Sequence, residues 1–240
     1  MLILAVDTST RTGSAALLRD SQVVAEISGY EETPYSTRLF RDIAVLQERA
    51  NFRMDQVDVF AVAAGPGSFT GLRVGLTAVK AWAEVHGKPI AAISGLEAIA
   101  AESLPGKALS ASDTSFIAPF LDARRGQVFG AIYQRISGSA ANLTLASDEL
   151  ILSLDEFLEL VGGSSHQPIQ LVSPTPDVLP VSRIREIFQD VVVEQVSSAL
   201  APAIGRLGFE RAKRGDLTDS FRLDANYVRR SDAESAWKDA

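Results

Sequence analysis

The chain has 240 residues, of which 46% are hydrophobic and 22% charged, and its formal net charge is −7 at pH 7. The absence of cysteine excludes disulfide frameworks, cysteine nucleophiles, thiolate zinc sites and iron–sulfur clusters. The net negative charge argues against a stand-alone nucleic-acid binder, because Lys and Arg supply most of the non-specific affinity for phosphates. The length allows one large domain or two small ones.

The basic residues gather near the end of the chain. Seven basic and four acidic residues lie between Arg206 and Arg230, which fits either a solvated helix and tail or a patch that contacts a polyanion or an acidic partner. The apolar opening Met1–Val6 stops at Asp7, too early for a signal sequence, and no apolar run approaches the roughly 20 residues of a membrane span. We expect a cytoplasmic protein without a membrane segment.

The first half predicts three strands followed by alternating helices and strands. Leu39, Ile43, Leu46 and Ala50 share one face of a helix that Ser36 or Thr37 would cap. The other expected elements are strands at Leu2–Val6, Ser14–Leu18, Val23–Ile27, Val57–Ala64 and Pro89–Ile93, and helices at about Thr70–His86 and Leu96–Ala101.

The second half repeats this order of elements without a visible residue repeat. Strands are expected at Phe116–Leu121, Gln127–Tyr133, Leu143–Leu145, Ile169–Val172 and Val191–Val193, and helices at Leu154–Val161, Pro176–Phe188 and Ser197–Arg214. A composition shift near Leu104–Ser115 predicts lobes at 1–105 and 106–214, with 215–240 free to pack back on the first lobe. The predicted fold is α/β, a duplicated mixed sheet flanked by helices in the two-lobed architecture of actin, Hsp70 and sugar kinases.

A glycine-rich turn between a strand and a helix is the most informative segment. Gly65, Gly67 and Ser68 could aim backbone N–H groups at an anion near a helix N-terminus. The turn lacks the Gly-Lys-Ser/Thr ending of a P-loop, the spacing of the dinucleotide fingerprint and the glycines of a hydrolase elbow. The alternative is a tight turn whose glycines let the strand and helix approach closely.

The turn after the first strand is a second candidate for anion binding. Asp7, Thr8, Ser9 and Thr10 occupy the place where actin-like proteins read Asp-x-Gly-Thr, and Ser9 replaces the glycine. A side chain there would crowd a phosphate, so a hairpin turn held by Asp and Thr hydrogen bonds is the stronger interpretation.

No residue set predicts catalysis or a resident metal. His86 and His166 are far apart in sequence and form no i, i+4 pair, and the carboxylates form no spaced pair.

Gly71, Gly75 and Ala78 form a stripe of small residues on one face of the second helix, which permits a close approach by this chain's own sheet or by a partner helix.

Several sequence blocks resemble the bacterial TsaB (YeaZ) family. They are Leu2–Ser9, Gly65–Gly75, Ile93–Ala98, Leu121–Gly126 and, near the C-terminus, Asn226–Arg229. The resemblance implies an actin-like fold and a role in making threonylcarbamoyladenosine next to the anticodon of tRNA, as the partner of the transferase TsaD. Tyr35 is a departure, since many family members have His before the residue that matches Ser36.

The resemblance also implies a set of partners and a pairing surface. A TsaE-like ATPase is expected, ATP/ADP and a metal are expected in partner subunits and not in this chain, and tRNA would be reached through the complex. The pairing surface is expected on about Ser36–Asn51 and Thr70–His86, and a homodimer is expected in the partner's absence. Its expected contact residues are Leu39, Ile43, Leu46, Gly71, Val74, Gly75, Ala78 and Trp82.

A missing metal site predicts that this chain is not itself a transferase. TsaD binds metal through two histidines in an Asn-His-x-Glu-Gly-His segment, and the matching positions here are Gly95 and Ile99. Neither side chain can bind a metal. The alternative is an enzyme acting alone, either a glycoprotease-like metallopeptidase or an actin-fold ATPase or kinase.

Overall fold

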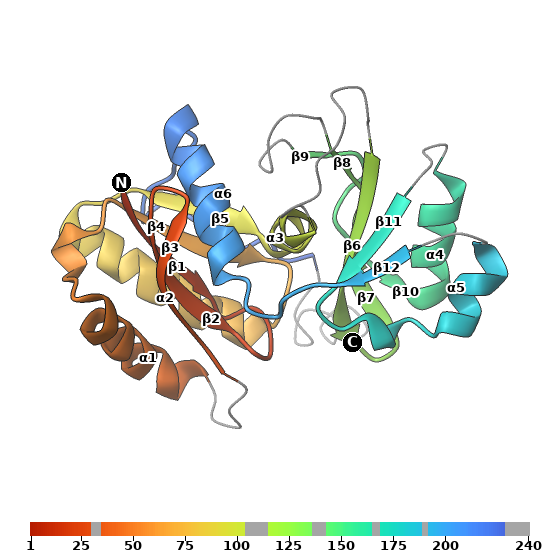
Figure 1. Ribbon diagram of the computed structural model, residues 1–240, viewed down its shortest axis with the longest axis horizontal. Helices are drawn as coiled ribbons and strands as arrows, with labels where there is room; N and C mark the ends of the chain where they lie inside the picture. The colour runs from red at the N-terminus through yellow and green to blue at the C-terminus, as the bar shows by residue number, and fades with distance from the viewer. Residues whose placement is uncertain (30–34, 104–114, 136–142, 165–168, 189–191, 229–240) are drawn as a thin grey trace, which may run out of the picture.

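The computed structural model describes residues 1–29, 35–103, 115–135, 143–164, 169–188 and 192–228. Two lobes, each built around one sheet, lie side by side (Figure 1). The boundary predicted at 105/106 lies outside the described residues. Within the described part of the chain, no helix combines the length and apolar character needed to cross a membrane.

The first sheet has five strands in the order β3-β2-β1-β4-β5. They are β1 (Leu2–Asp7), β2 (Ser14–Arg19), β3 (Gln22–Ser28), β4 (Val59–Gly65) and β5 (Ile90–Ser94). β1 pairs antiparallel with β2 and parallel with β4, which pairs parallel with β5. Every residue of β1 and β4 is buried, as their continuous apolar sequences predict for a sheet covered on both faces.

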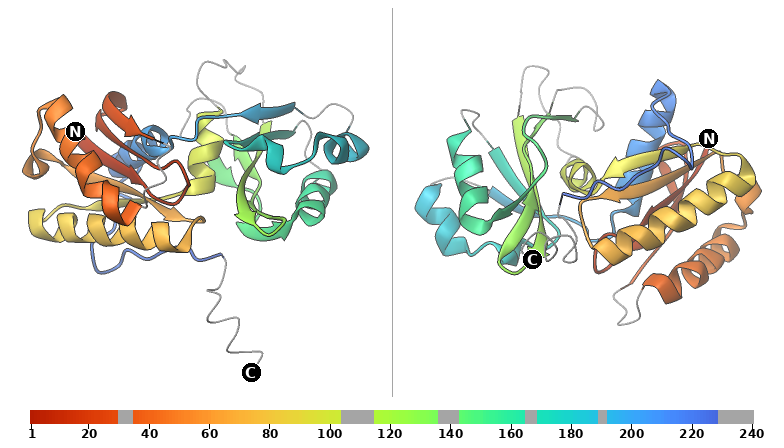
Figure 2. Two further views of the ribbon diagram at one scale, coloured as in Figure 1. Left: turned by 90° about the horizontal axis from the view of Figure 1, so that it is seen from below. Right: turned by 180° about the vertical axis from the view of Figure 1, so that it is seen from behind.

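Two helices cover one face of the first sheet, α1 (Tyr35–Ala50) and α2 (Phe69–His86), with the short η1 (Met54–Gln56) between them (Figure 2). The Ser68 hydroxyl caps α2 by accepting from Gly71 N at 3.2 Å, and Gly87 ends α2 with φ of 60°. The expected cap of α1 is wrong, because this helix already begins at Tyr35 and includes Ser36 and Thr37.

The second sheet, in the order β10-β7-β6-β11-β12, repeats the topology of the first. In addition, β8 pairs with β6, and β9 pairs with β8. The duplication predicted from the order of elements is therefore one of topology. The elements are β6 (Ser115–Arg124), β7 (Gln127–Gly130), β8 (Tyr133–Arg135), β9 (Leu143–Leu145), β10 (Leu150–Ser153), α4 (Leu154–Gly163), β11 (Ile169–Ser173), η2 (Pro176–Val178), α5 (Val181–Ile187) and β12 (Val192–Gln195).

Two expected elements of the second lobe are each divided in the structure. The strand predicted at Gln127–Tyr133 is two strands, because β7 pairs with β6 and β10 whereas β8 pairs with β6 and β9. The helix predicted at Pro176–Phe188 is interrupted before Pro180, which has no N–H to donate and disfavours a helical conformation in the residue before it.

Two further helices, α3 (Gly95–Glu102) and α6 (Ala201–Arg214), complete the fold, with α3 between the two lobes (Figure 1). Their side chains share one core with residues of both sheets: Ile204 and Leu207 of α6 belong to the same core as Leu18 of β2 and Ile117 of β6. The prediction that α6 belongs to a second lobe at 106–214 is wrong, because α6 packs on β1, β2, β4 and β5 of the first sheet. Sequence order alone did not indicate that the chain returns to the first lobe after β12.

The segment 216–228, which we call the strap, follows α6 along the first lobe. Thr218 exchanges backbone hydrogen bonds with Ile90 at the edge of β5, at 2.9 and 2.8 Å. Leu223 is buried in the core beneath α1 and α2, and Asn226 N donates to Ala64 O at 2.7 Å. The strap thus covers an exposed sheet edge and brings its last residues to the C-terminal end of β4.

Replacing Gly208 by Ala tests the packing of α6 on the first sheet. The added Cβ would lie 2.8 Å from Cβ of Ala61 on a fully buried strand, so we expect the free energy of unfolding to fall by about 1–3 kcal/mol. Urea denaturation measures this change. Gly163→Ala is the matched control, since no atom lies within 4 Å of its added Cβ. Equal stability of the two variants would contradict the packing described.

Candidate functional site: the cleft between the lobes and the helical face

A cleft of about 840 Å³ lies between the lobes. Its walls are the β1–β2 turn, the glycine-rich turn before α2, the β6–β7 turn and the end of the strap. The two turns that the sequence singled out therefore meet at one place. Ser9, Thr10, Gly67 and Ser68 line the cleft, whereas Asp7, Thr8 and Gly65 lie behind its surface.

Asp7 is buried and satisfied by its own turn. Its carboxylate accepts from Ser9 N at 2.8 Å, Ser9 Oγ at 2.6 Å and Thr10 Oγ1 at 2.8 Å. Burial raises the pKa of Asp7 above its ordinary value of 3.8, and the hydrogen bonds from Ser9 and Thr10 partly oppose that shift. This geometry favours the hairpin-turn interpretation over direct contact of Asp7 with a phosphate.

The β1–β2 turn occupies the space beside the glycines near the start of α2. A Cβ on Gly67 would lie 2.7 Å from Ser9, and Cβ atoms on Gly71 and Gly75 would lie 2.0 and 2.3 Å from Thr8 oxygen atoms. Thr8 Oγ1 donates to Gly71 O at 2.7 Å, and Ser68 N donates to Ser9 O at 2.8 Å. These glycines thus allow a close approach between two parts of the same lobe.

Most of the residues predicted to contact a partner lie in the core of the first lobe, so that prediction is wrong for them. Leu39, Ile43, Leu46, Gly75 and Ala78 are buried, and Gly71 packs against Thr8. An apolar stripe at i, i+4 and i+7 is the face a helix turns toward its own sheet, and spacing could not distinguish that from a partner-facing stripe. Val74 and Trp82 remain half-buried.

The outer surface of α1 and α2 carries large apolar side chains that the sequence analysis missed. Phe40 is 62% exposed and Val85 is 77% exposed. The ring of Phe40 meets the ring of Trp82 edge-on, with centroids 5.9 Å apart, and so joins the two helices. We call Phe40, Trp82 and Val85 the helical face. Trp82 was among the expected contact residues, whereas Phe40 and Val85 lie off the buried stripe, so the periodic apolar pattern did not indicate them.

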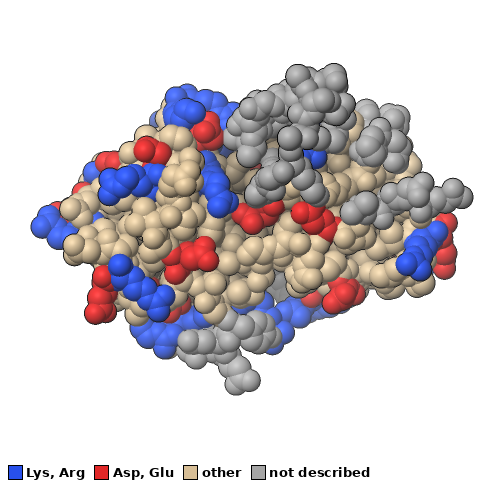
Figure 3. All heavy atoms as spheres, in the orientation of Figure 1, with Lys and Arg blue, Asp and Glu red and all other residues tan. Residues whose placement is uncertain are grey.

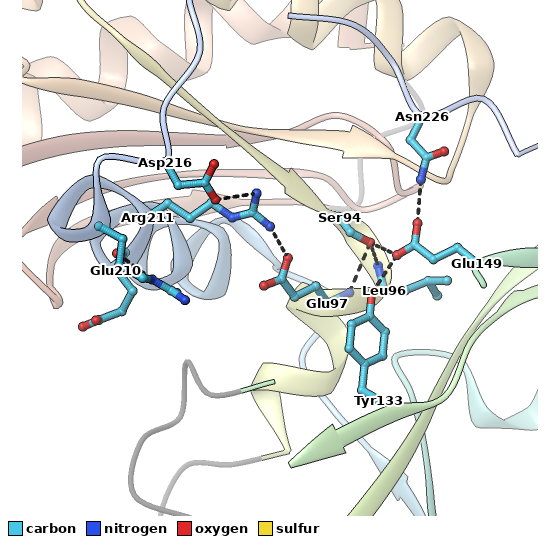
Figure 4. Close-up of polar contacts among 10 residues, drawn as sticks. Ser94, Leu96, Glu97, Tyr133, Glu149, Glu210, Arg211, Asp216 and Asn226 are labelled. Atoms are coloured by element: carbon cyan, nitrogen blue, oxygen red, sulfur yellow. Dashed lines mark hydrogen bonds and ion pairs between the residues drawn. The ribbon is translucent and has the colours of Figure 1, made fainter. Parts of the chain in front are cut away.

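A carboxylate that the sequence did not single out links the two lobes (Figure 4). Glu149, just before β10, accepts from Tyr133 of β8 at 2.7 Å, from Asn226 of the strap at 2.5 Å and from the Ser94 hydroxyl. Ser94 also caps α3 by accepting from Leu96 N at 3.1 Å. Burial and the nearby Glu149 carboxylate raise the pKa of Tyr133, so its phenol stays protonated as a donor.

Gly95 and Ile99, which the resemblance implies stand at the TsaD histidine positions, lie within the packed interior. Ile99 is fully buried in the core between the sheets, and a Cβ on Gly95 would lie 3.2 Å from Pro66 O. Among the described residues no group of three or more His, Cys, Asp or Glu side chains is arranged to hold a metal ion. His166 lies outside the described residues.

The basic side chains near the C-terminus are largely paired with acids. Arg206 contacts Glu102 at 3.2 Å, Arg211 contacts Glu97 at 2.8 Å and Lys213 contacts Glu210 at 3.1 Å. Figure 3 shows basic and acidic side chains interspersed over the first lobe. In the described part of this stretch, the pairing favours a solvated helix over a polyanion-binding patch.

The fold and the cleft define a two-lobed protein of the actin, Hsp70 and sugar kinase architecture. A hexokinase from Thermus thermophilus shares the fold, with a TM-score of 0.53 and 9% identity over 88% of this chain and all of that one. A Pseudomonas aeruginosa protein described as similar to peptidase YeaZ has a TM-score of 0.72 and 22% identity over 95% of this chain and 99% of that one. The predicted fold class is confirmed.

Sequence comparison defines the family. The sequence-family model described as TsaD, tRNA N6-adenosine threonylcarbamoyltransferase, matches residues 32–205 of this chain. The tRNA threonylcarbamoyladenosine biosynthesis protein TsaB of Bacillus subtilis is 31% identical over 99% of this chain and 98% of its own length. The chain belongs to the TsaB (YeaZ) family, as its motifs predicted, and the match to the TsaD model makes it a relative of the transferase as well.

Replacing Glu149 by Ala tests the link between the lobes. The change leaves the buried Tyr133 hydroxyl without its acceptor, so we expect the free energy of unfolding to fall by about 1–3 kcal/mol. Glu159→Ala on the exposed side of α4 is the matched control. In a double-mutant cycle, Tyr133→Phe should cancel part of the loss, and strictly additive effects would contradict a direct interaction.

Replacing Asp7 by Asn tests the charge buried behind the cleft. Because the pKa of Asp7 is raised on folding, the Asp7 carboxyl stays protonated to a higher pH in the folded state than in the unfolded chain. Its contribution to stability is therefore largest below the unfolded value of 3.8 and declines as pH rises toward the folded value. Denaturation across pH 4–7 should show the native chain losing stability relative to Asp7→Asn. A relative gain with rising pH would contradict the raised pKa.

Proposed function

We propose that this chain is a non-catalytic subunit in the formation of threonylcarbamoyladenosine in tRNA, and that it pairs with a TsaD-like transferase. The identity of its relatives supports the pathway, since TsaB proteins are named for threonylcarbamoyladenosine biosynthesis. The observation that carries the non-catalytic role is the packing of Gly95 and Ile99 where TsaD has its metal ligands. A buried isoleucine and a glycine against Pro66 O leave no donor atoms for an ion.

The helical face is the surface that would receive the partner. Phe40, Trp82 and Val85 provide apolar area that a monomer would otherwise expose to water, with aromatic rings of the kind that dominate binding energy at interfaces. Because the buried stripe of α1 and α2 packs on the chain's own sheet, the partner would contact the opposite side of these helices. In the partner's absence the same face would support a homodimer.

The beginning of α1 connects this surface to the cleft. Tyr35 OH and Arg38 Nη2 both donate to Thr12 O, at 3.0 and 2.6 Å. Thr12 belongs to the cleft wall, so a partner that fixes α1 would also fix the β1–β2 turn. We propose that the chain acts by such positioning, while ATP/ADP and the metal belong to the TsaD-like subunit and a TsaE-like ATPase, and tRNA is reached through the complex.

The alternative is an enzyme that works alone, as a metallopeptidase or an actin-fold ATPase or kinase. A metallopeptidase needs ligands at positions such as Gly95 and Ile99. A kinase needs phosphate access to the β1–β2 turn, where Thr8 and Ser9 are packed against the glycines of α2. No specific observation favours this alternative, and turnover of ATP or a peptide by the purified chain would support it.

Charge substitutions on the helical face test the proposal. Phe40→Glu and Val85→Glu should each raise the Kd for the organism's own TsaD-like protein by about 30-fold or more, because they place an unpaired carboxylate in an apolar interface. Val181→Glu is the matched control, since Val181 is 60% exposed on α5 of the other lobe. Sedimentation velocity of the mixed proteins measures the complex. Failure of the native chain to bind the TsaD-like protein at micromolar concentration would contradict the proposal.

A further inference from the structure

We propose that the mouth of the cleft binds a single-stranded segment of RNA, with a base against Phe69 and Tyr227 and phosphates near Arg11, Arg73 and Arg124. This inference rests on the proposed function, which makes tRNA the molecule under modification. It goes beyond that function by assigning this chain a direct contact with RNA. The residues assigned are neither on the helical face nor among the partners of Glu149, which are Ser94, Tyr133 and Asn226.

An aromatic platform stands at one side of the cleft mouth. Phe69, at the start of α2, and Tyr227, at the end of the strap, both line the cleft, and their ring centroids are 5.0 Å apart. Tyr227 is 41% exposed. The Arg73 guanidinium lies 3.8 Å from the centroid of Phe69, and its Nε donates to the Tyr227 hydroxyl at 3.4 Å. Phe69 is half-buried, so the accessible surface of the platform is chiefly the Tyr227 ring. An accessible ring beside an arginine suits the stacking of an unpaired base.

Arginines from both lobes flank this platform. Arg11 lines the cleft from the β1–β2 turn, and Arg124 lines it from the β6–β7 turn with its side chain 64% exposed. Arg124 and Arg125 have φ of 66° and 57°, a conformation that is uncommon for residues other than glycine. Asp122 is the acidic residue among the described cleft-lining residues, and it accepts from Arg124 N at 2.7 Å. The Asp122 carboxylate also lies 3.6 Å from the Arg124 guanidinium, so it offsets part of the positive charge of that side chain. With Arg11, Arg73 and Arg124 against this one carboxylate, the cleft mouth carries an excess of basic side chains on a chain that is acidic overall.

The remaining lining distinguishes an RNA strand from a free nucleotide bound as in a kinase. Thr8 and Ser9 fill the space beside Gly67 and Gly71, so phosphates have no approach to the bottom of the β1–β2 turn. Anions can reach the arginines at the mouth, which suits a backbone that passes across the opening. Thr12, Thr70 and Ser198 add hydroxyl groups along this route that can hydrogen-bond ribose or phosphate.

Fluorescence anisotropy of the full chain with a labelled single-stranded oligoribonucleotide tests the proposal. Binding should weaken with salt at a log–log slope of about −2, since three arginines neutralise phosphates at about 0.7 each. Arg124→Gln should reduce that slope by about 0.7. Tyr227→Ala should weaken binding about tenfold, and Tyr227→Phe, which keeps the ring, should stay within about twofold of the native chain.

The strap supplies matched controls outside the cleft lining. Phe221 is 86% exposed, and Arg222 is similarly exposed beside Asp219. Phe221→Ala and Arg222→Gln should bind the oligoribonucleotide as the native chain does. Equal losses from these controls, or no loss from both Tyr227→Ala and Arg124→Gln, would overturn the proposal. Circular dichroism confirms that each variant is folded.

Competition experiments distinguish single-stranded RNA from other ligands that the same cleft residues would bind. A duplex RNA, AMP and an acidic peptide should each compete at least tenfold less well than the unlabelled single strand. A better competition by AMP would indicate a nucleotide site, and one by the peptide would indicate a protein-docking patch; either result overturns the proposal. Each variant is also tested for binding to the TsaD-like protein. Loss of RNA binding with intact pairing would reject only this inference, whereas loss of pairing by the native chain would reject the proposed function.

Discussion

The close approach between the Thr8–Ser9 turn and the glycines of α2 is the constraint on which the first lobe depends. Thr8 Oγ1 donates to Gly71 O at 2.7 Å, and Ser9 O accepts from Ser68 N at 2.8 Å. A Cβ at Gly67, Gly71 or Gly75 would overlap these partners, and so the direction of α2 relative to β1 is fixed by the absence of side chains. The same contact sets one wall of the cleft, closes the position a phosphate would use and leaves the outer side of α2 to solvent.

The lobes are joined by a hydrogen-bonded carboxylate near the place where the resemblance puts a metal in TsaD. Glu149 accepts from Ser94, Tyr133 and Asn226, which come from the first lobe, the second lobe and the strap. A metal centre and a carboxylate with several donors can both hold facing elements together, but only an ion polarises a substrate oxygen. Ser94 is adjacent to Gly95, so a structural link occupies the neighbourhood of the absent ligands.

Sequence patterns predicted the elements well where one physical rule applied. Apolar runs identified β1 and β4, and the end of α2 predicted at about His86 is confirmed, with Gly87 as its C-cap. They could not place α6, because its small residues Gly205 and Gly208 fit β2 and β4 only after the chain has crossed back to the first lobe. The role of Glu149 was not predicted for a similar reason, since the three residues that donate to it are distant in sequence. The apolar stripe of α1 was seen correctly but assigned to the wrong neighbour, as periodicity reports that a face is buried and not what covers it.

The beginning of α1 shows how two surfaces of an otherwise rigid lobe can depend on each other. Arg38 is buried, donates to Gly29 O at 2.7 Å and to Thr12 O at 2.6 Å, and lies over the Tyr35 ring at 4.1 Å. A Cβ on Gly13 would lie 1.8 Å from Tyr35 OH, so the positive φ of Gly13 and the bulk of Tyr35 are matched. The third donor group, Arg38 Nε, has no hydrogen-bond partner among the described residues and lies 3.9 Å from the Asp42 carboxylate. Because an unpaired buried guanidinium is costly, a shift of α1 that broke the contact with Thr12 O, a carbonyl of the cleft wall, would be unfavourable. The beginning of α1 is therefore hydrogen-bonded to the cleft wall at Thr12, on the same helix that carries Phe40. The partner proposed for the helical face would act on the cleft wall through these contacts.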